Sequence, residues 1–480
     1  MNFYENRPTR DALYYFGLIC SIPHPSGHEQ KLAEKIISLA KEHGLSVRQD
    51  DAGNVRIDRP ATPGYENAPR IILQGHIDMV PKAAAGKVFD FETQPIELIE
   101  ENGILRASGT TLGADNGAGA ACILALLFDP TVKAGHLAGL FTVQEETGLI
   151  GANLLDPEML NGDWLFNLDA GSFHKFCIGC AGGARLSFDI PVTRKEIPAG
   201  TRYVVRLRGL SGGHSGGKIH EKRGNALILL CQLLQKLNVN ALCSLNGGSA
   251  DNAIPAEADA VIVSGKSLNE LQELAATFRK ESAETFSAPE DYHFEIDQEN
   301  GTDKILDPDF TERFLQLAAT VPNEVFDTDP ELGIVKTSSN FASVHTMENS
   351  IIIHTSQRSL EDEQRVAITE RIKDHFAPLN GTVDISGVYP GWPANADSEP
   401  VRFAGLIHKE IYGELPGVYA VHAGLETGAF AKKNPSLQII SFGPPEEDIH
   451  TEREWMDLNK FEEFNKLLRV IVGQARKKGN

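Results

Sequence analysis

The chain has 480 residues, too many for one ordinary hydrophobic core, so its length favours two domains. Its 45 basic and 66 acidic side chains give a formal net charge of −21, which disfavours nucleic acid as a partner because a phosphate backbone would be repelled. The hydrophobic fraction of 41% is ordinary for a globular protein, and no apolar run approaches the roughly 18 residues that a membrane span needs.

Two further features concern the compartment. Residues 1–16 lack the basic, apolar and small-residue segments of a secretion signal. Six scattered cysteines form no disulfide framework, which fits a reducing compartment. Cys177 and Cys180 form a C-x-x-C pair, but Cys231 and Cys243 do not supply the second pair that a structural zinc site requires. We therefore expect a cytoplasmic protein with ordinary unpaired thiols and no membrane contact.

The first part of the chain alternates between helix and strand patterns. Residues 30–44 place apolar side chains on one helical stripe, and Ser26 with Glu29 would form a capping box before it. A further helix is predicted over 118–129. Short apolar runs predict strands, and they lie at 70–75, 136–144, 163–168 and, far downstream, 436–442. Such alternation is typical of an α/β domain with a mostly parallel sheet and helices on both faces.

The middle of the chain has an α+β composition. Alternating strand patterns and long helical patterns follow one another at 202–210, 225–238, 258–265, 267–286 and 350–359. The late strand at 436–442 again resembles the first kind. We therefore predict a discontinuous α/β catalytic domain, residues 1–185 and 393–480, interrupted by an inserted α+β domain over 186–392.

Acidic residues and histidines follow the α/β strand patterns or begin a helix. The segments are GHID (75–78), ADNGAG (114–119), QEETG (144–148), LDAGS (168–172) and GPPEEDIHTE (443–452). The carboxyl ends of strands in an open α/β sheet meet at one edge, where ligands bind. A pair of borderline-soft divalent ions needs histidine and carboxylate ligands. The candidate ligands are His76, Asp115, Glu146, Asp169 and His450.

Each feature alone has an ordinary explanation. His76 and Asp78 could form a surface pair, Asp115 could be a helix N-cap, and LDAG could be a simple turn. The placement of all five segments at one edge of the predicted sheet favours a metal centre over five unrelated features.

The order of these motifs resembles the M20 family of two-zinc metallopeptidases, and within it the aminoacyl-histidine dipeptidases. This resemblance implies that one zinc is bound by His76 and Asp169, the other by Glu146 and His450, and that Asp115 bridges both. It implies that Asp78 orients His76, that the Asp115–Asn116 peptide is cis, and that Glu145 is the general base for a zinc-bridging water. Mn²⁺ or Co²⁺ could replace Zn²⁺.

The same resemblance assigns roles in the insert, which would act as a lid and dimerisation domain. His214, in the segment 207–226, would reach the partner protomer's active site in a homodimer and steady the oxyanion. Asn252 would also act across the dimer. Arg358 would grip the C-terminal carboxylate of a small peptide substrate. Two further residues, Gly424 and Glu426, would line the substrate end, whereas His220 and His422 are expected to be structural.

Several alternatives stay open. Residues 213–217 fit the letters of the serine-hydrolase motif G-x-S-x-G, which would make Ser215 a nucleophile. That motif needs a strand directly before it and a helix directly after it, and the pattern predicts no helix until beyond His220. A non-catalytic zinc scaffold is a second alternative, although Glu145 is present with every ligand. Within the family, a tripeptidase or an N-acyl-amino-acid hydrolase would use a similar metal site.

Overall fold

The computed structural model describes residues 7–286, 289–302 and 304–476, so the first six of the N-terminal residues considered above lie outside it. The chain packs as two compact units. The first contains the chain up to Cys180, Trp392–Ala420 and the part from Leu425 on, and the second contains Ala181–Gly391 and Val421–Gly424. The short segment Val421–Gly424, which the predicted division places with the first domain, packs with the second unit. None of the described helices is long and apolar enough to cross a membrane.

The first unit is built on an eight-stranded sheet. Its central strands β6, β3, β7 and β23 are parallel, and antiparallel strands flank them. In spatial order the strands are β1 (Ser46–Gln49), β2 (Val55–Arg59), β6 (Leu137–Thr142), β3 (Ile71–His76), β7 (Trp164–Asn167), β23 (Gln438–Ser441), β8 (Lys175–Cys180) and β22 (Gly417–Val421). Every residue of β3 and β6 is buried, as expected for strands covered on both faces.

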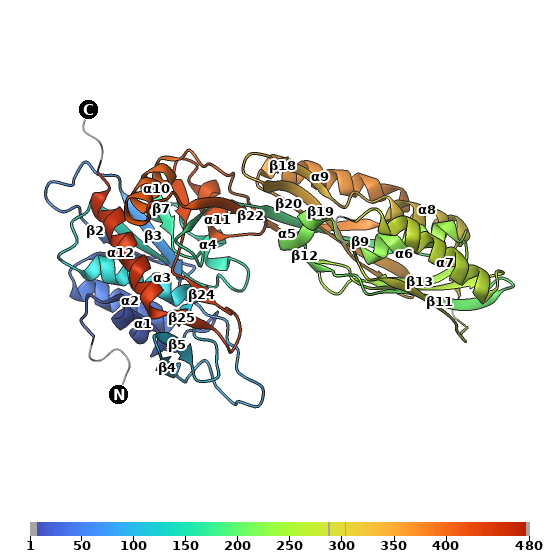
Figure 1. Ribbon diagram of the computed structural model, residues 1–480, viewed down its shortest axis with the longest axis horizontal. Helices are drawn as coiled ribbons and strands as arrows, with labels where there is room; N and C mark the ends of the chain where they lie inside the picture. The colour runs from blue at the N-terminus through green and yellow to red at the C-terminus, as the bar shows by residue number, and fades with distance from the viewer. Residues whose placement is uncertain (1–6, 287–288, 303, 477–480) are drawn as a thin grey trace. The chain divides into compact units, whose positions relative to one another are not determined.

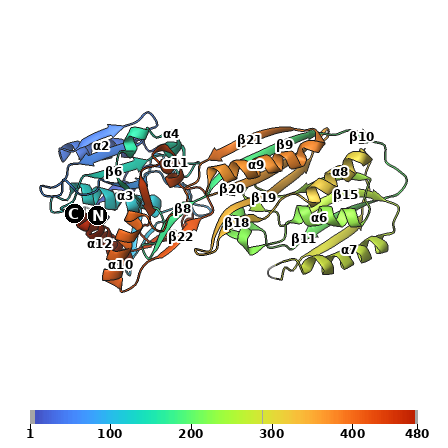
Figure 2. The ribbon, with the colours of Figure 1, turned by 90° about the horizontal axis from the view of Figure 1, so that it is seen from above.

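Helices cover both faces of this sheet (Figures 1 and 2). α3 packs against β3 and β6 together with α1 and α12, and α11 packs with α4 on the other face. The helices are α1 (Ala12–Cys20), α2 (Gln30–Glu42), α3 (Ala114–Phe128), α4 (Ile150–Leu154), η1 (Pro157–Leu160), α10 (Glu399–Tyr412), α11 (Glu426–Lys433) and α12 (Leu458–Gln474). A separate four-stranded sheet has the order β24 (Glu446–Glu447), β25 (Trp455–Asp457), β5 (Ile104–Ala107), β4 (Leu98–Glu101).

Two strand glycines let α3 lie close to the sheet. A Cβ on Gly139 would stand 2.7 Å from side-chain atoms of both Ile123 and Leu127, and a Cβ on Gly75 would stand 2.2 Å from the Asn116 side chain. These contacts are shorter than any that packed carbon atoms adopt. The absence of a side chain at these positions therefore allows the start of α3, with Asp115, to lie beside the end of β3, with His76.

The second unit contains a nine-stranded sheet in which all neighbouring strands are antiparallel. Its order is β16 (His293–Gln298), β11 (Thr201–Arg208), β15 (Ala258–Ser264), β13 (Leu242–Gly247), β19 (Ile334–Thr346), β20 (Ser350–Ser359), β9 (Gly182–Pro191), β21 (Thr382–Tyr389), with β18 (Val325–Asp329) beside β19. The helices are α5 (Ser215–Lys218), η2 (Ile219–Glu221), α6 (Ala226–Lys236), α7 (Leu268–Ala283), α8 (Pro308–Ala319), α9 (Asp362–Phe376) and η3 (Ala377–Leu379). The short pairs β12 (Gly213–His214) with β14 (Ala253–Ile254), and β10 (Arg194–Lys195) with β17 (Ile305–Leu306), complete it.

One hydrophobic cluster of the second unit joins the inner face of its sheet to α6, α7, α8 and α9. This arrangement and the parallel centre of the first unit confirm the predicted fold class, an α/β unit with a separate antiparallel α+β unit. All six cysteines are buried, and no disulfide joins them in the described residues.

The predicted capping box is wrong. α2 begins at Gln30, and no side chain caps its start. Glu29 instead accepts hydrogen bonds from the backbone N–H groups of Gly27 and Gln144, and the Ser26 hydroxyl donates to Asp78. Both side chains thus form hydrogen bonds with the segments that follow β3 and β6, which are remote in sequence.

Candidate metal centre

All five predicted ligands meet at one edge of the first unit's sheet. His76 is the last residue of β3, Asp115 lies in the first turn of α3, and Glu146, Asp169 and His450 follow β6, β7 and β24. The ligand atoms of His76, Asp115 and Glu146 lie within 4.8 Å of one another, close enough to share a metal ion. The parallel centre of the sheet explains most of this convergence, because β3, β6 and β7 end at the same edge, and the segment that follows the parallel strand β23 leads through β24 to His450.

Asp115 stands between two pairs of side chains. Its Oδ1 is 3.1 Å from His76 Nε2, and that nitrogen is 3.6 Å from Asp169 Oδ1. Its Oδ2 is 3.2 Å from His450 Nε2, and that nitrogen is 2.8 Å from Glu146 Oε1. One oxygen of the Asp115 carboxylate therefore lies beside the His76–Asp169 pair, and the other lies beside the His450–Glu146 pair. The Asp115–Asn116 peptide is cis.

The electrostatics of the site fit a bound cation. Three carboxylates face only two imidazoles, and most of these groups are largely buried. Burial, followed by the charge of Asp115, raises the pKa of Asp169 to about 8. Burial also raises the pKa of Glu145 well above its usual range. Buried like charges of this kind are costly unless a counter-charge is present, and a divalent ion would supply it.

Asp78 organises the segment that contains Glu145 and Glu146. Its Oδ1 accepts from the Glu145 N–H at 2.9 Å, and its Oδ2 accepts from the Glu146 N–H at 3.2 Å and from the Ser26 hydroxyl at 2.7 Å. The ring Nδ1 of His76 is 3.4 Å from Asp78 Oδ1 and 3.0 Å from the Asp78 carbonyl oxygen. Asp78 is thus placed to orient both His76 and the candidate base with its neighbour.

Glu426, predicted to line the substrate end, is a buried side chain of the first unit. It is 1% exposed and accepts hydrogen bonds from Gln74 Nε2 at 2.6 Å and Thr142 Oγ1 at 3.0 Å. Gln74 lies two residues before His76 on β3. Glu426 thus joins β3 to β6 beneath the candidate metal centre.

Within the second unit, His214 and Asn252 are close together. β12 pairs with β14, and the Ser215 N–H donates to the Asn252 carbonyl oxygen at 2.7 Å. The exposed His214 ring accepts at Nδ1 from the backbone N–H groups of Gly216 (3.1 Å) and Gly217 (3.3 Å). An accepting Nδ1 leaves the proton of the neutral ring on Nε2, so His214 can present an N–H donor. Partial burial, followed by the charge of Arg358, lowers the pKa of His214 and favours this neutral form.

The surroundings of Ser215 disfavour the serine-hydrolase alternative. The expected gap before the next helix is wrong, because the single turn α5 begins at Ser215 and β12 directly precedes it. However, Ser215 is only 2% exposed, and its hydroxyl has no hydrogen-bond partner in the described residues. A serine nucleophile needs an accessible hydroxyl and an adjacent base.

Arg358 lies on β20 and is 8% exposed. Its Nη1 donates to the Tyr389 hydroxyl at 2.9 Å, whereas its Nε has no partner in the described structure. The Tyr389 ring occupies the space beside two glycines, because a Cβ on Gly183 or Gly424 would stand 2.5 or 2.7 Å from ring atoms. Gly424, expected at the substrate end, thus leaves space for the ring of Tyr389, whose hydroxyl accepts the hydrogen bond from Arg358.

His422 is a buried neighbour of this arginine. It is 8% exposed, and its Nε2 is 2.7 Å from the Ser338 hydroxyl. Burial, followed by the charge of Arg358, lowers the pKa of His422 to about 3. This environment agrees with the expected structural role of a neutral histidine.

The low pKa of His422 predicts a specific pH dependence of stability. Between pH 3 and about 6.5 the His422 ring is protonated only in the unfolded chain, so protonation favours unfolding. The contribution of the neutral ring to the free energy of unfolding is therefore complete above about pH 6.5 and is lost as the pH falls. From pH 6.5 to pH 5, we expect wild type to lose about 1–2 kcal/mol of unfolding free energy relative to His422→Gln. Urea unfolding of both proteins at several pH values measures this difference, and identical pH slopes would contradict it.

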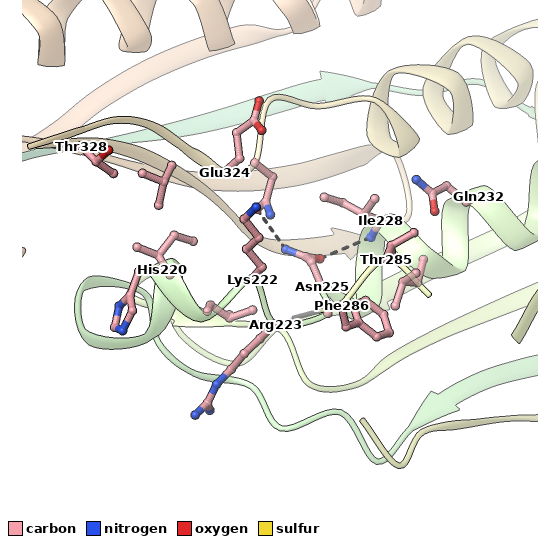
Figure 3. Close-up of a pocket in the computed structure, with 16 residues that line it drawn as sticks. His220, Lys222, Arg223, Asn225, Ile228, Gln232, Thr285, Phe286, Glu324 and Thr328 are labelled. Carbon is pink, nitrogen blue, oxygen red and sulfur yellow. Dashed lines mark hydrogen bonds between the residues drawn. The ribbon is translucent and has the colours of Figure 1, made fainter. Parts of the chain in front are cut away.

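The second unit also contains a separate pocket of about 590 Å³ beside α6 (Figure 3). His220, Lys222 and Glu324 line it, and Asn225 at the start of α6 donates to Asn323 at 3.2 Å. None of the predicted ligand, base or substrate residues is among its lining residues. The candidate metal ligands therefore lie outside this pocket, in the first unit.

Comparisons with known proteins agree with the geometry of the candidate centre. Residues 72–474 match the model of peptidase family M20/M25/M40. The cytosol non-specific dipeptidase of Escherichia coli (strain K12) is 37% identical over 453 residues, which cover 91% of this chain and 93% of that protein. The crystal structure of aminoacylhistidine dipeptidase from Vibrio alginolyticus matches with a TM-score of 0.92 at 35% identity and covers 98% of each chain.

More distant relatives share only the fold. The aminopeptidase PepT from Bacillus cereus has a TM-score of 0.61 at 17% identity, with 98% of this chain and 99% of that chain covered. The resemblance inferred from the sequence motifs is confirmed by the matches that span nearly the whole chain. The chain belongs to peptidase family M20/M25/M40.

Proposed function

We propose that this protein is a cytosolic metal-dependent dipeptidase that hydrolyses Xaa-His and other dipeptides, including β-alanyl-histidine. The observation that supports it most directly is the placement of Asp115 between two His–carboxylate pairs, with Glu145 adjacent. The 37% identical cytosol non-specific dipeptidase and the aminoacylhistidine dipeptidase structure indicate the substrate class.

In this proposal two divalent ions, most simply Zn²⁺, would occupy the centre. His76 and Asp169 would hold one and Glu146 and His450 the other, with Asp115 shared between them. The donor set of imidazole and carboxylate suits zinc, with Mn²⁺ or Co²⁺ as substitutes. Bound ions of this kind lower the pKa of water and polarise a carbonyl oxygen.

Glu145 moves the proton. Its backbone is held by Asp78, and its carboxyl group lies in a buried environment that raises its pKa. A carboxylate with a raised pKa accepts a proton from the attacking water more readily and then delivers it to the leaving amine. The neighbouring Glu146 cannot share this role because it contacts His450 within the ligand group.

Side chains of the second unit would bind the substrate. The Nε2–H of His214 can donate to the oxygen on which negative charge develops, as in an oxyanion hole. The guanidinium of Arg358 can bind the C-terminal carboxylate of the dipeptide, since its planar donors match a carboxylate.

We expect chelation to abolish activity and added Zn²⁺ or Mn²⁺ to restore it. The metal-defined enzyme is then assayed against β-alanyl-histidine, several α-dipeptides, tripeptides and acetylated amino acids. Preferential cleavage of dipeptides supports the proposal. Cleavage of tripeptides or acetylated amino acids in their place would assign the protein to another activity of the family. Ser215→Ala serves as a control that should retain turnover.

The predicted homodimer, with His214 and Asn252 completing the partner's site, is tested by complementation. Glu145→Ala and His214→Ala chains are co-expressed with different tags, and the mixed dimer is purified. If His214 acts on the partner, one of the two sites in the mixed dimer contains both groups, and activity returns. If His214 serves its own chain, no site is complete, and the mixture stays as inactive as its parents.

Removing the Tyr389 hydroxyl should weaken substrate binding. In Tyr389→Phe the ring still fills the space beside Gly183 and Gly424, but Arg358 Nη1 loses its 2.9 Å acceptor. We expect KM for dipeptides to rise about 5- to 10-fold, with kcat changed less than twofold, because one hydrogen bond to a charged group is worth about 1–3 kcal/mol. Steady-state kinetics measure both values. A fall in kcat at constant KM would contradict a role in carboxylate binding.

A further inference from the structure

Glu454 is a buried carboxylate to which the sequence analysis assigns no role. It is 2% exposed and lies four residues after the predicted ligand His450. Its two oxygens accept four backbone hydrogen bonds from the segment that begins α3. Oε2 accepts from Leu112 (2.8 Å) and Gly113 (3.1 Å), and Oε1 accepts from Ala114 (2.8 Å) and Asp115 (3.3 Å).

These four N–H groups need an external acceptor. Gly113 has a left-handed φ of +73°, and Asp115 and Asn116 have non-helical backbone angles, so the regular part of α3 begins only after them. The N–H groups of this irregular segment therefore find their acceptor outside it, in the Glu454 carboxylate, about 340 residues away in the sequence.

The segment that contains Glu454 is itself tied together. The Glu454 N–H donates to the Thr451 carbonyl oxygen at 3.2 Å, and the Thr451 hydroxyl donates to the Asp448 carbonyl oxygen at 2.7 Å. His450 lies within this turn, and its Nε2 is 3.2 Å from Asp115 Oδ2. One carboxylate thus joins the backbone around Asp115 to the turn that contains His450.

We infer that Glu454 is a positioning residue of the metal centre, which sets the spacing between Asp115 and His450 that a shared ion requires. The inference rests on the proposed metal centre. Groups that orient metal ligands without touching the ion typically change metal affinity about 10- to 100-fold when they are removed. Glu454→Ala would leave four buried N–H groups without an acceptor and free the His450 turn to move.

The matched control is Asp457, a second capping carboxylate three residues further along. Its Oδ1 accepts from the N–H groups of Asn459 (2.9 Å) and Lys460 (3.2 Å) at the start of α12, a helix that contains none of the predicted ligands. Asp457→Ala, the matched truncation, should lower thermal stability because the cap is lost, but it should leave metal affinity at the wild-type value.

The experiment measures Zn²⁺ binding to the purified, metal-free full chain by competition with a chromophoric chelator, together with thermal unfolding without metal. We expect Glu454→Ala to bind Zn²⁺ about 10- to 100-fold more weakly than wild type. Glu454→Gln, which keeps one acceptor oxygen, should bind Zn²⁺ with an affinity between those of wild type and Glu454→Ala. Turnover at fixed Zn²⁺ should decrease mainly in kcat and recover partly at high Zn²⁺.

Two results would overturn the inference. One is wild-type Zn²⁺ affinity in a folded Glu454→Ala protein, or in Glu454→Gln if the alanine variant does not fold. The other is an equal loss of affinity in Asp457→Ala, which would mean that any damaged cap has this effect. Failure of wild type itself to bind Zn²⁺ would instead reject the proposed metal centre, so the two failures can be told apart.

Discussion

Glu145→Ala is expected to lose about 10²- to 10⁴-fold in kcat while it binds metal as tightly as wild type, since this is the range that one general base contributes. The reason is the division of work between two neighbouring residues. Glu146 Oε1 is 2.8 Å from His450 Nε2 in the ligand group, whereas Glu145 belongs to neither His–carboxylate pair around Asp115. Measured kcat and Zn²⁺ content of the purified variant test this expectation.

The matched comparison is Glu146→Ala, one residue further along the chain. That variant should lose metal as well as activity, because it removes a ligand and not a proton acceptor. Wild-type turnover in metal-loaded Glu145→Ala would remove this residue from the mechanism. Loss of metal in the same variant would show that it is a ligand.

Asp115→Ala is expected to abolish detectable activity and weaken the binding of both ions. Asp115 places one oxygen 3.1 Å from His76 Nε2 and the other 3.2 Å from His450 Nε2, so its removal affects both halves of the centre. Because it would bind the ions directly, we expect the loss of affinity to exceed the roughly 100-fold that removal of an orienting group produces. Metal titration of the metal-free chain measures affinity and stoichiometry.

Asp169→Ala provides the contrast for this prediction. Of the two candidate histidine ligands, Asp169 pairs with His76, at 3.6 Å, so its removal should weaken one ion and leave the other bound by Glu146, Asp115 and His450. The expected stoichiometry is therefore two ions in wild type, one in Asp169→Ala and fewer than one in Asp115→Ala. Equal stoichiometry in the two variants would contradict the bridging position of Asp115.

The sequence by itself determined the fold class and predicted that the candidate metal ligands lie at one edge of a sheet, for a physical reason. Buried parallel strands need nearly unbroken apolar runs, and these runs are visible without a structure. Their carboxyl ends meet at one edge, so residues such as His76 and Asp169 were expected to converge although 93 positions separate them in the printed sequence. The alternating strands and long helices of the second unit were equally visible as local periodicity.

Only the tertiary structure decided how the supporting side chains are used. Asp78 holds the backbone of Glu145 across 67 positions, Glu426 meets Gln74 across 352, and Glu454 meets Ala114 across 340. Local periodicity and short motifs report on neighbours in sequence, whereas these hydrogen bonds satisfy buried polar groups that become neighbours only after the sheet and helices have packed. For that reason the sequence predicted a helix cap at Ser26 and Glu29 and assigned no role to Glu454.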